Sequence, residues 1–229
     1  MGGFKIREDY VEIESSDDRN TMWDDFKFGK PGIYSAYEED FHVYTAGDFT
    51  ITSTGSGSRA VTDGVGGLLL ITTGGTNDNS EEFQLKSETF LPAAGKEIFY
   101  EARFKVEDAD DCDFFMGLAD TDTEVIDGVS DGIYFKSDDG DANVDFGTMN
   151  TSVGSLEGAV GTILDDTFIK VGFKVVGVSS VEAWINDSKV ATLTTLIPTT
   201  ELTVSFALQT GSANARTMTL DRINAFQEM

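Results

Sequence analysis

The sequence predicts an all-β protein, an antiparallel β-sandwich preceded by an N-terminal arm, and three observations lead to this fold class. Short segments of alternating apolar and polar residues recur at spacings of roughly 8–12 residues, which is typical of sandwiches and barrels. Glycine is abundant, with 24 residues, and supplies turns between these segments. No stretch keeps an apolar period of about 3.6 residues over three helical turns.

Residues 1–46 differ from the rest of the chain, because they combine many aromatic and acidic residues with weak periodicity. Residues 11–14 predict a short strand, and residues 24–32 are typical of a strand end bounded by turns. We interpret the segment as an arm that packs along the sandwich or onto a neighbouring molecule. The candidate partner-binding residues in it are Trp23, Phe26, Phe28, Tyr34 and Tyr37.

The predicted sandwich covers residues 47–229. Its first strands are expected at residues 48–54 and 66–73, each followed by a glycine-containing loop. The clearest strand is residues 97–106, where a period of two predicts one buried face and one face in water. The predicted buried face holds Ile98, Tyr100, Ala102, Phe104 and Val106, and the predicted wet face holds Phe99, Glu101, Arg103 and Lys105.

Later strands follow the same logic. Residues 132–136 and 142–146 predict a hairpin, because Asp139-Gly140 is a strong turn signal between them. The C-terminal third alternates again, so further strands are expected at residues 169–176, 181–186, 189–193, 202–209 and 218–223.

The formal charge of −25, from 16 basic and 41 acidic residues, limits the partners. Such a charge repels phosphate backbones and anionic lipid, so we expect neither nucleic-acid nor membrane binding. Its simplest meaning is solubility or adaptation to a salty medium. The alternative is a basic partner surface or bound cations.

Cys112 is the only cysteine, so no intrachain disulfide is expected. The N-terminus becomes acidic where the apolar part of a secretion signal would lie, so we expect no standard export.

Several segments resemble concanavalin A-like jelly rolls. They are residues 98–119, in which a long strand, an acidic turn and a second strand ending in Gly117-Leu118 follow one another; residues 168–173 and 181–186; and the closing residues 220–226. The resemblance covers residues 47–227 and implies a fold, not a function.

A narrower resemblance rests on residues 48–51, 66–73, 97–106 and 131–143, which are similar to jelly-roll decoration or cement proteins of tailed bacteriophage capsids. It implies a virion structural protein that binds and stabilises the outer surface of a phage head. The implied partners are the major capsid protein and further copies of this chain, as a homo-oligomer such as a trimer. The implied location is the capsid exterior, after synthesis in the host cytoplasm.

The sequence carries no recognisable catalytic set, so we expect no enzyme. Retaining glucanases of this shape resemble one another in a Glu-x-Asp-x-x-Glu strand, whose alternate carboxylates share a face. Here Glu97 and Glu101 share a face, but without that motif they are interpreted as solvated acids. His42 is the only histidine, which excludes a multi-histidine zinc site and makes a catalytic triad unconvincing. Cys112 lies between two aspartates, which disfavours a thiolate, so it is interpreted as a strand-entry residue.

No cofactor is expected, with Ca²⁺ as the one ion to consider. The candidate ligands are Asp139, Asp141 and Asn143, because hard oxygen ligands around a glycine turn suit Ca²⁺. An acidic hairpin turn without a metal is the preferred interpretation. A second acidic loop has the same two interpretations, and it holds Asp120, Asp122, Glu124 and Asp127.

The alternative function is a lectin-like carbohydrate-binding module, possibly calcium-dependent. Trp184 lies on the strand face opposite Val181 and Ala183, where it would serve as a stacking platform for a sugar if exposed. Packing of Trp184 under a loop or in a subunit contact is the preferred interpretation.

Overall fold

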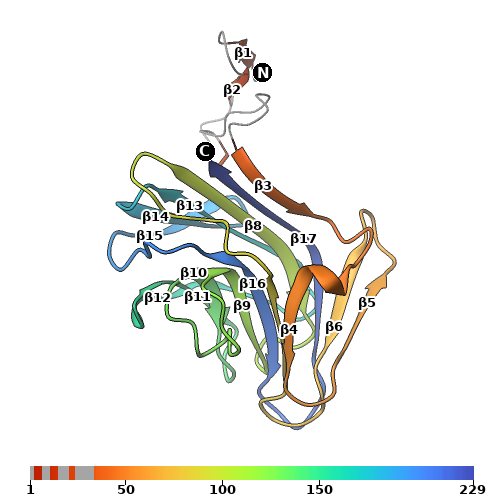
Figure 1. Ribbon diagram of the computed structural model, residues 1–229. Coiled ribbons are helices and arrows are strands. Elements are labelled where there is room, and N and C mark those ends of the chain that lie inside the picture. Colours follow the sequence, from red (N-terminus) through yellow and green to blue (C-terminus); the bar gives the residue numbers. More distant parts are fainter. Residues whose placement is uncertain (1–2, 7–10, 15–20, 24–33) are drawn as a thin grey trace.

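The computed structural model describes residues 3–6, 11–14, 21–23 and 34–229. Within these ranges it has no α-helix, and its one 3₁₀ turn is η1 (Ala46–Asp48). No helical segment there has the length and apolarity to cross a bilayer. Figure 1 shows two layers of strands facing each other. The sequence-based prediction of an antiparallel β-sandwich is confirmed.

The first layer is a seven-stranded antiparallel sheet. In spatial order its strands are β12 (Val153–Thr162), β11 (Asn143–Asn150), β10 (Gly132–Ser137), β9 (Cys112–Ala119), β16 (Thr203–Thr210), β7 (Ser80–Leu85) and β4 (Phe49–Ser53).

The second layer is an eight-stranded antiparallel sheet. Its main path is β15 (Ser188–Leu193), β14 (Ser180–Ile185), β13 (Ile169–Val176), β8 (Glu97–Val106), β17 (Thr217–Glu228), β6 (Leu68–Thr72) and β5 (Ser58–Thr62), and β3 (Tyr34–Glu39) pairs with β17. A separate hairpin joins β1 (Gly3–Ile6) and β2 (Val11–Glu14), which confirms the strand expected at residues 11–14.

The core lies between the sheets and is rich in aromatic rings. Phe83 and Phe206 stack with ring centroids 4.6 Å apart, and Tyr100 stacks on Phe173 at 4.9 Å. These rings come from opposite sheets, since β7 and β16 belong to the first and β8 and β13 to the second. The inward face predicted for residues 97–106, which includes Tyr100, is therefore confirmed, whereas the strand that carries Phe83 was not expected.

The β10–β11 hairpin and the outer face of β8 differ in how far they follow the sequence pattern. The hairpin of β10 and β11 is confirmed, and Gly140 in its turn has φ 97°, a left-handed conformation that favours glycine. The expectation of a wet outer face on β8 is wrong for Phe99, which is fully buried, and for Glu101, which is only 6% exposed, whereas Arg103 and Lys105 on the same face are partly exposed. Met22 and Trp23, from the N-terminal segment, pack over this part of the face.

The division between arm and sandwich stays a prediction, but contacts place part of the predicted arm within the sandwich. β3 pairs with the C-terminal half of β17 over six residues, from Tyr34 opposite Glu228 to Glu39 opposite Ile223. Phe41 is fully buried in the main core, and Tyr44 packs against that core. Residues 34–46 therefore contribute Tyr37, Phe41 and Tyr44 to the hydrophobic core of the domain.

Candidate functional site

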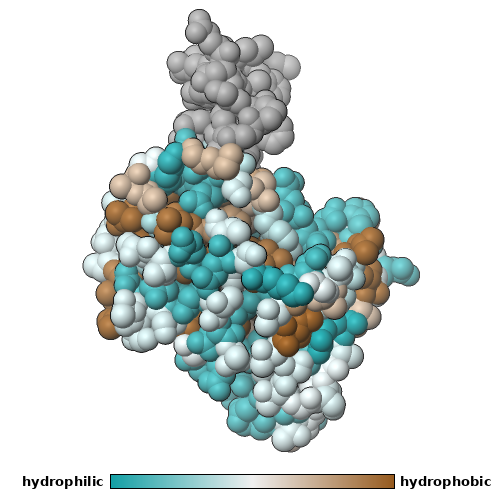
Figure 2. All heavy atoms as spheres, in the orientation of Figure 1, coloured by the Kyte–Doolittle hydropathy of each residue, from teal (hydrophilic) through white to brown (hydrophobic). Residues whose placement is uncertain are grey.

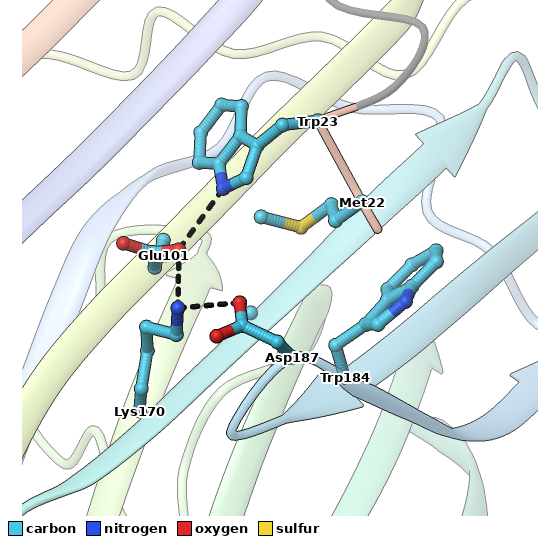
Figure 3. A pocket seen from close by; sticks show the side chains of 7 residues that line it. Met22, Trp23, Glu101, Lys170, Trp184 and Asp187 are labelled. Atoms are coloured by element: carbon cyan, nitrogen blue, oxygen red, sulfur yellow. Dashed lines mark hydrogen bonds and ion pairs between the residues drawn. The ribbon is translucent and has the colours of Figure 1, made fainter. Parts of the chain in front are cut away.

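Part of the outer face of the eight-stranded sheet is covered by Met22 and Trp23, which lie over β8, β13, β14 and β17 (Figure 3). Trp23 donates a hydrogen bond from Nε1 to Glu101 Oε2 at 3.0 Å. Its ring stacks on Phe99, with centroids 5.7 Å apart, and meets Phe226 edge-on at 5.9 Å. Gly172 makes room for the side chain of Met22, because a Cβ at position 172 would lie 3.0 Å from Met22 Cε. Met22 and Trp23 are thus anchored by ring stacking, one hydrogen bond and a shape fit.

The charged groups around this anchor are paired with one another. Glu101 lies 3.8 Å from Lys170 Nζ and 3.2 Å from an Arg222 nitrogen, and Lys170 also pairs with Asp187 (Figure 3). The cavity left among these side chains is about 10 Å³, room for one water molecule at most. This place binds the chain's own N-terminal residues and is too small for another ligand.

Trp184 is 5% exposed and belongs to a small apolar cluster with Met22 and Phe99. The prediction that Trp184 forms an exposed stacking platform for a sugar is therefore wrong. The preferred interpretation, that Trp184 packs under another segment of the chain, is confirmed. The physical reason is coverage from outside the sheet, which a strand pattern does not encode.

The candidate partner-binding residues do not form one surface. Trp23 and Tyr34 both pack on Phe99 of the chain's own sheet. Tyr37 packs instead against the main core, and burial raises the pKa of its hydroxyl. Phe26 and Phe28 lie outside the described residues. Binding of a second molecule by these residues stays a prediction.

We expect the variant Trp23→Ala to lower the free energy of unfolding by about 1–2 kcal/mol, because it uncovers Phe99 and removes the hydrogen-bond donor to Glu101. Urea denaturation followed by circular dichroism measures the loss. Trp23→Phe, which keeps a stacking ring but no donor, should lose less. Unchanged stability in Trp23→Ala would contradict the docking of residues 21–23.

The outer face of the seven-stranded sheet carries an apolar layer of its own. Phe115 of β9 stacks on Tyr134 of β10 with centroids 4.8 Å apart. Val125 and Val129, from the loop of residues 120–131, complete this buried cluster. We call this segment the covering loop. The covering loop packs on the outer side chains of β9, β10 and β16, which the strand pattern alone would place in water.

Side chains of β7 hold the covering loop in place. Glu82 accepts hydrogen bonds from Ser80 Oγ at 2.7 Å and from the backbone N–H of Val125. Gln84 donates to the carbonyl oxygen of Asp120 and accepts from the N–H of Asp122, both at 2.8 Å. Burial raises the pKa of the Glu82 carboxyl, although its hydrogen bonds partly oppose that effect. Glu82 and Gln84 therefore act as positioning residues for the loop.

A polar recess of about 220 Å³ remains beside the covering loop, and we call it the acidic recess. Four of its lining residues are carboxylates, namely Asp78, Glu82, Glu124 and Asp127. Three more are neutral and polar, namely Thr54, Ser80 and Gln209. Ser80 and Glu82 are buried, whereas Asp78, Glu124 and Asp127 are exposed. None of the described residues that line the recess is a lysine or arginine.

Asp113 lies on the same sheet face and was missed by the sequence analysis. It pairs across the sheet with Gln209, which lines the acidic recess. Its side chain is buried, and its Oδ1 has no hydrogen-bond partner among the described residues. Burial, followed by the charges of Asp139 and Asp138, raises its pKa to about 7. Strand alternation with Phe115 and Gly117 was the signal that could have placed it on this face.

The candidate calcium ligands are not assembled around one point. Asp141 accepts the backbone N–H of Asn143 at 2.8 Å, an interaction typical of a turn. Asp139 is exposed, and Asp138 pairs with Lys136 at 2.8 Å. Among the described residues, no three acidic, histidine or cysteine side chains gather in a way that could hold a metal ion. Calcium binding stays a prediction.

The carboxylate pair considered for catalysis is engaged elsewhere. Glu97 pairs with Lys174 at 3.0 Å, and Glu101 holds Trp23 and Arg222. Cys112 is the first residue of β9, as expected of a strand-entry residue, and burial raises the pKa of its thiol to about 12. His42 is exposed and contacts Asp40 at 2.7 Å.

An open groove of about 390 Å³ lies on another side of the sandwich, along β3 and the residues that follow β7. Its lining includes the apolar side chains of Tyr37, Leu85 and Phe90, with Asp48 and Lys86 as its charged groups. One charge of each sign gives it little electrostatic selectivity. The acidic recess is chemically more distinctive.

Comparison with known proteins supports the fold. No family model matches the chain, and no curated protein matches it. Endo-1,3-β-glucanase from Streptomyces sioyaensis is similar in structure, with a TM-score of 0.63 and 12% identity over 87% of this chain and 98% of that one. A protein of unknown function, SO2946 from Shewanella oneidensis MR-1, has a TM-score of 0.62 and 16% identity over 86% of this chain and 87% of that one.

A further similar structure is the carbohydrate recognition domain of Emp46p in its metal-free form, with a TM-score of 0.53 and 7% identity over 79% of this chain and 88% of that one. The concanavalin A-like jelly roll is therefore confirmed. The narrower resemblance to capsid decoration proteins finds no support in these structures. At such identities the likeness establishes the fold alone.

Proposed function

We propose that the chain is a non-catalytic, lectin-like module that binds a small saccharide in the acidic recess. The observation that carries this proposal is the polar lining of a recess of about 220 Å³ on the outer face of the seven-stranded sheet. Carboxylates are strong hydrogen-bond acceptors, and sugar hydroxyls are donors that such a lining satisfies. The recess is smaller than the roughly 300–1,000 Å³ of drug-sized ligand sites, which favours one or two sugar rings.

The fold neighbours lend support of a general kind. They include carbohydrate recognition domains and carbohydrate-cleaving enzymes, so this scaffold supports saccharide sites in other proteins. Fold alone does not carry a function, and the recess is the feature specific to this chain.

We propose that the module is non-catalytic because the buried carboxylate of the recess is already engaged within the chain. Both oxygens of Glu82 accept hydrogen bonds, from Ser80 and from the covering loop. The covering loop also fills the middle of the sheet face with Val125 and Val129. A long polysaccharide lying across the sheet would have to displace these side chains. The capsid decoration role stays a prediction from sequence resemblance, and no contact described above favours it.

A glycan array, read with and without calcium, tests the proposal. We expect saturable binding to a subset of saccharides, and a loss of at least about tenfold in Glu124→Gln and Asp127→Asn, the exposed acids of the recess. The matched control is Asp63→Asn, which removes the same charge from an exposed residue that does not line the recess.

No saccharide binding at any concentration would reject the proposed function. Equal binding by all three variants would place the site elsewhere and reject the assignment to the recess. Sugar release from a bound oligosaccharide would reject the non-catalytic part.

A further inference from the structure

We infer that the open groove beside β3 binds an extended, basic peptide segment of a partner protein, which adds to the eight-stranded sheet as a further strand. This groove shares no lining residue with the acidic recess, so the inference does not depend on the proposed function. Three features carry it: the unpaired edge of β3, the apolar wall that faces this edge, and the charges around both.

β3 is the border of the eight-stranded sheet at one end of β17. On one side of β17 lies β8, and on the other side β3 and β6 follow one another along its length. β5 pairs with β6, but the corresponding place beyond β3 is free of any described strand (Figure 1). In an antiparallel sheet, alternate residues of such an edge turn their N–H and C=O groups away from the paired strand. Among the described residues, none of the backbone hydrogen bonds outside the strand ladders involves residues 35–39.

The groove runs along this free edge. Ser35, Ala36 and Tyr37 all line it, although consecutive side chains of a strand point to opposite faces. Three consecutive residues can share one groove only where the groove follows their backbone. At about 3.3 Å per residue, the lined part of β3 is about 10 Å long, and a volume of about 390 Å³ lies alongside it. The backbone of an added strand would therefore lie opposite the unpaired groups of β3.

The wall that faces β3 offers apolar contact and is held in place. Leu85 and Phe90 line it, and the backbone of Phe90 exchanges hydrogen bonds with Leu202 in both directions. The N–H of Lys86 donates to the carbonyl oxygen of Asp48 at 3.3 Å, which joins the wall to η1. Every second side chain of an added strand would face this wall, so apolar residues are favoured at those positions. Because both sides of the groove are already held, binding requires little reordering.

The charges around the edge favour a basic segment. Glu38 of β3 is exposed, as are Asp40, which follows the strand, and Asp48 in the groove. Lys86 is the one cation in the described lining. Opposite charges on neighbouring strands stabilise the pair, whereas like charges destabilise it. The same acids disfavour pairing with a second copy of this chain, whose net charge is −25, so the partner is a basic segment of another protein.

Fluorescence anisotropy on the full chain tests the inference with a labelled peptide of alternating lysine and valine, as long as the six residues of β3. We expect this peptide to bind at least about tenfold more tightly than one of alternating glutamate and valine. The lysine–valine peptide with every backbone nitrogen methylated keeps its charges but loses its backbone donors, and it should bind at least about tenfold more weakly. Hydrogen exchange at residues 35–39 should slow when the unmethylated peptide is bound.

Two pairs of variants locate the site. Gly47 lines the groove, and a Cβ at this position would meet only Thr45 Cγ2, at 3.9 Å, so Gly47→Trp should fold and occupy part of the groove. It should weaken binding of the lysine–valine peptide at least about tenfold, whereas Gly158→Trp, on the exposed strand β12, should leave binding unchanged. Glu38→Lys should also weaken binding, whereas Glu157→Lys, the same change of charge on β12, should not.

Three results would overturn the inference: no binding of the lysine–valine peptide, equal binding of its methylated form, or binding that Gly47→Trp leaves unchanged. A concentration-dependent dimer that Gly47→Trp abolishes would assign the groove to a second copy of the chain and overturn the choice of a basic partner. None of these results bears on saccharide binding in the acidic recess, so the proposed function stands or fails separately.

Discussion

Phe206→Ala should lower the free energy of unfolding by about 3–5 kcal/mol, the cost usually found for removing a buried phenylalanine. Phe206 is fully buried on β16, near the middle of the seven-stranded sheet. Its ring stacks on Phe83 at 4.6 Å and meets Phe49 edge-on at 5.6 Å. Alanine would remove both ring contacts and leave a cavity that the two sheets cannot close.

Urea denaturation of the purified chain measures this loss. Phe168→Ala is the matched control, because Phe168 is partly exposed and its ring mainly contacts Arg103, whose guanidinium lies 4.1 Å from the ring centroid. The control should lose about 1 kcal/mol or less. Similar losses in the two variants would contradict a core centred on the Phe83–Phe206 stack.

Asp113→Asn should stabilise the protein at pH 8 by up to about 4 kcal/mol, the free energy that corresponds to a pKa shift of about three units, and change little at pH 4. The pKa of Asp113 is raised to about 7 in the folded protein, above the value of an unfolded chain. Between those two pKa values the folded state holds the proton more tightly, so stability falls as the pH rises through this window. Asparagine removes the titrating group, and with it this part of the pH dependence.

Thermal melts of the parent and of Asp113→Asn from pH 4 to pH 8 test whether the variant becomes the more stable protein as the pH rises. The difference between variant and parent isolates Asp113, since every other titrating group is shared. Asp63→Asn removes an exposed charge and should follow the parent over the whole range. A variant that is less stable than the parent at pH 8 would show that the Asp113 carboxylate is satisfied in solution.

Much of the fold could be read from local patterns. Residues 97–106, 132–136 and 169–176 were expected as strands, and each matches a strand to within a residue or two. The Asp139-Gly140 turn was also found, because only a few residue types tolerate its backbone conformation. Such features depend on neighbours in sequence.

The candidate site could be read only in part. Glu124 and Asp127 were singled out as members of an acidic loop, and they do line the recess. Glu82, Ser80 and Asp113 were not, because an acid within an apolar strand looks the same whether water or another loop covers it. The partner of Glu82 lies 43 residues away, in the covering loop.

The sequence by itself determined several of the strands and the core-facing side of the clearest one, residues 97–106, since strand alternation places successive side chains on opposite faces. It did not identify β3, β5, β7 or β12. Only the tertiary structure decided what covers the two outer faces. Trp23 reaches Glu101 across 78 residues of sequence and helps to bury Glu101 and Phe99 on a face that the strand pattern assigns to water. Likewise, the covering loop closes the middle of the other sheet and leaves the acidic recess at its side. Such coverage depends on contacts between distant segments, and no local period records them.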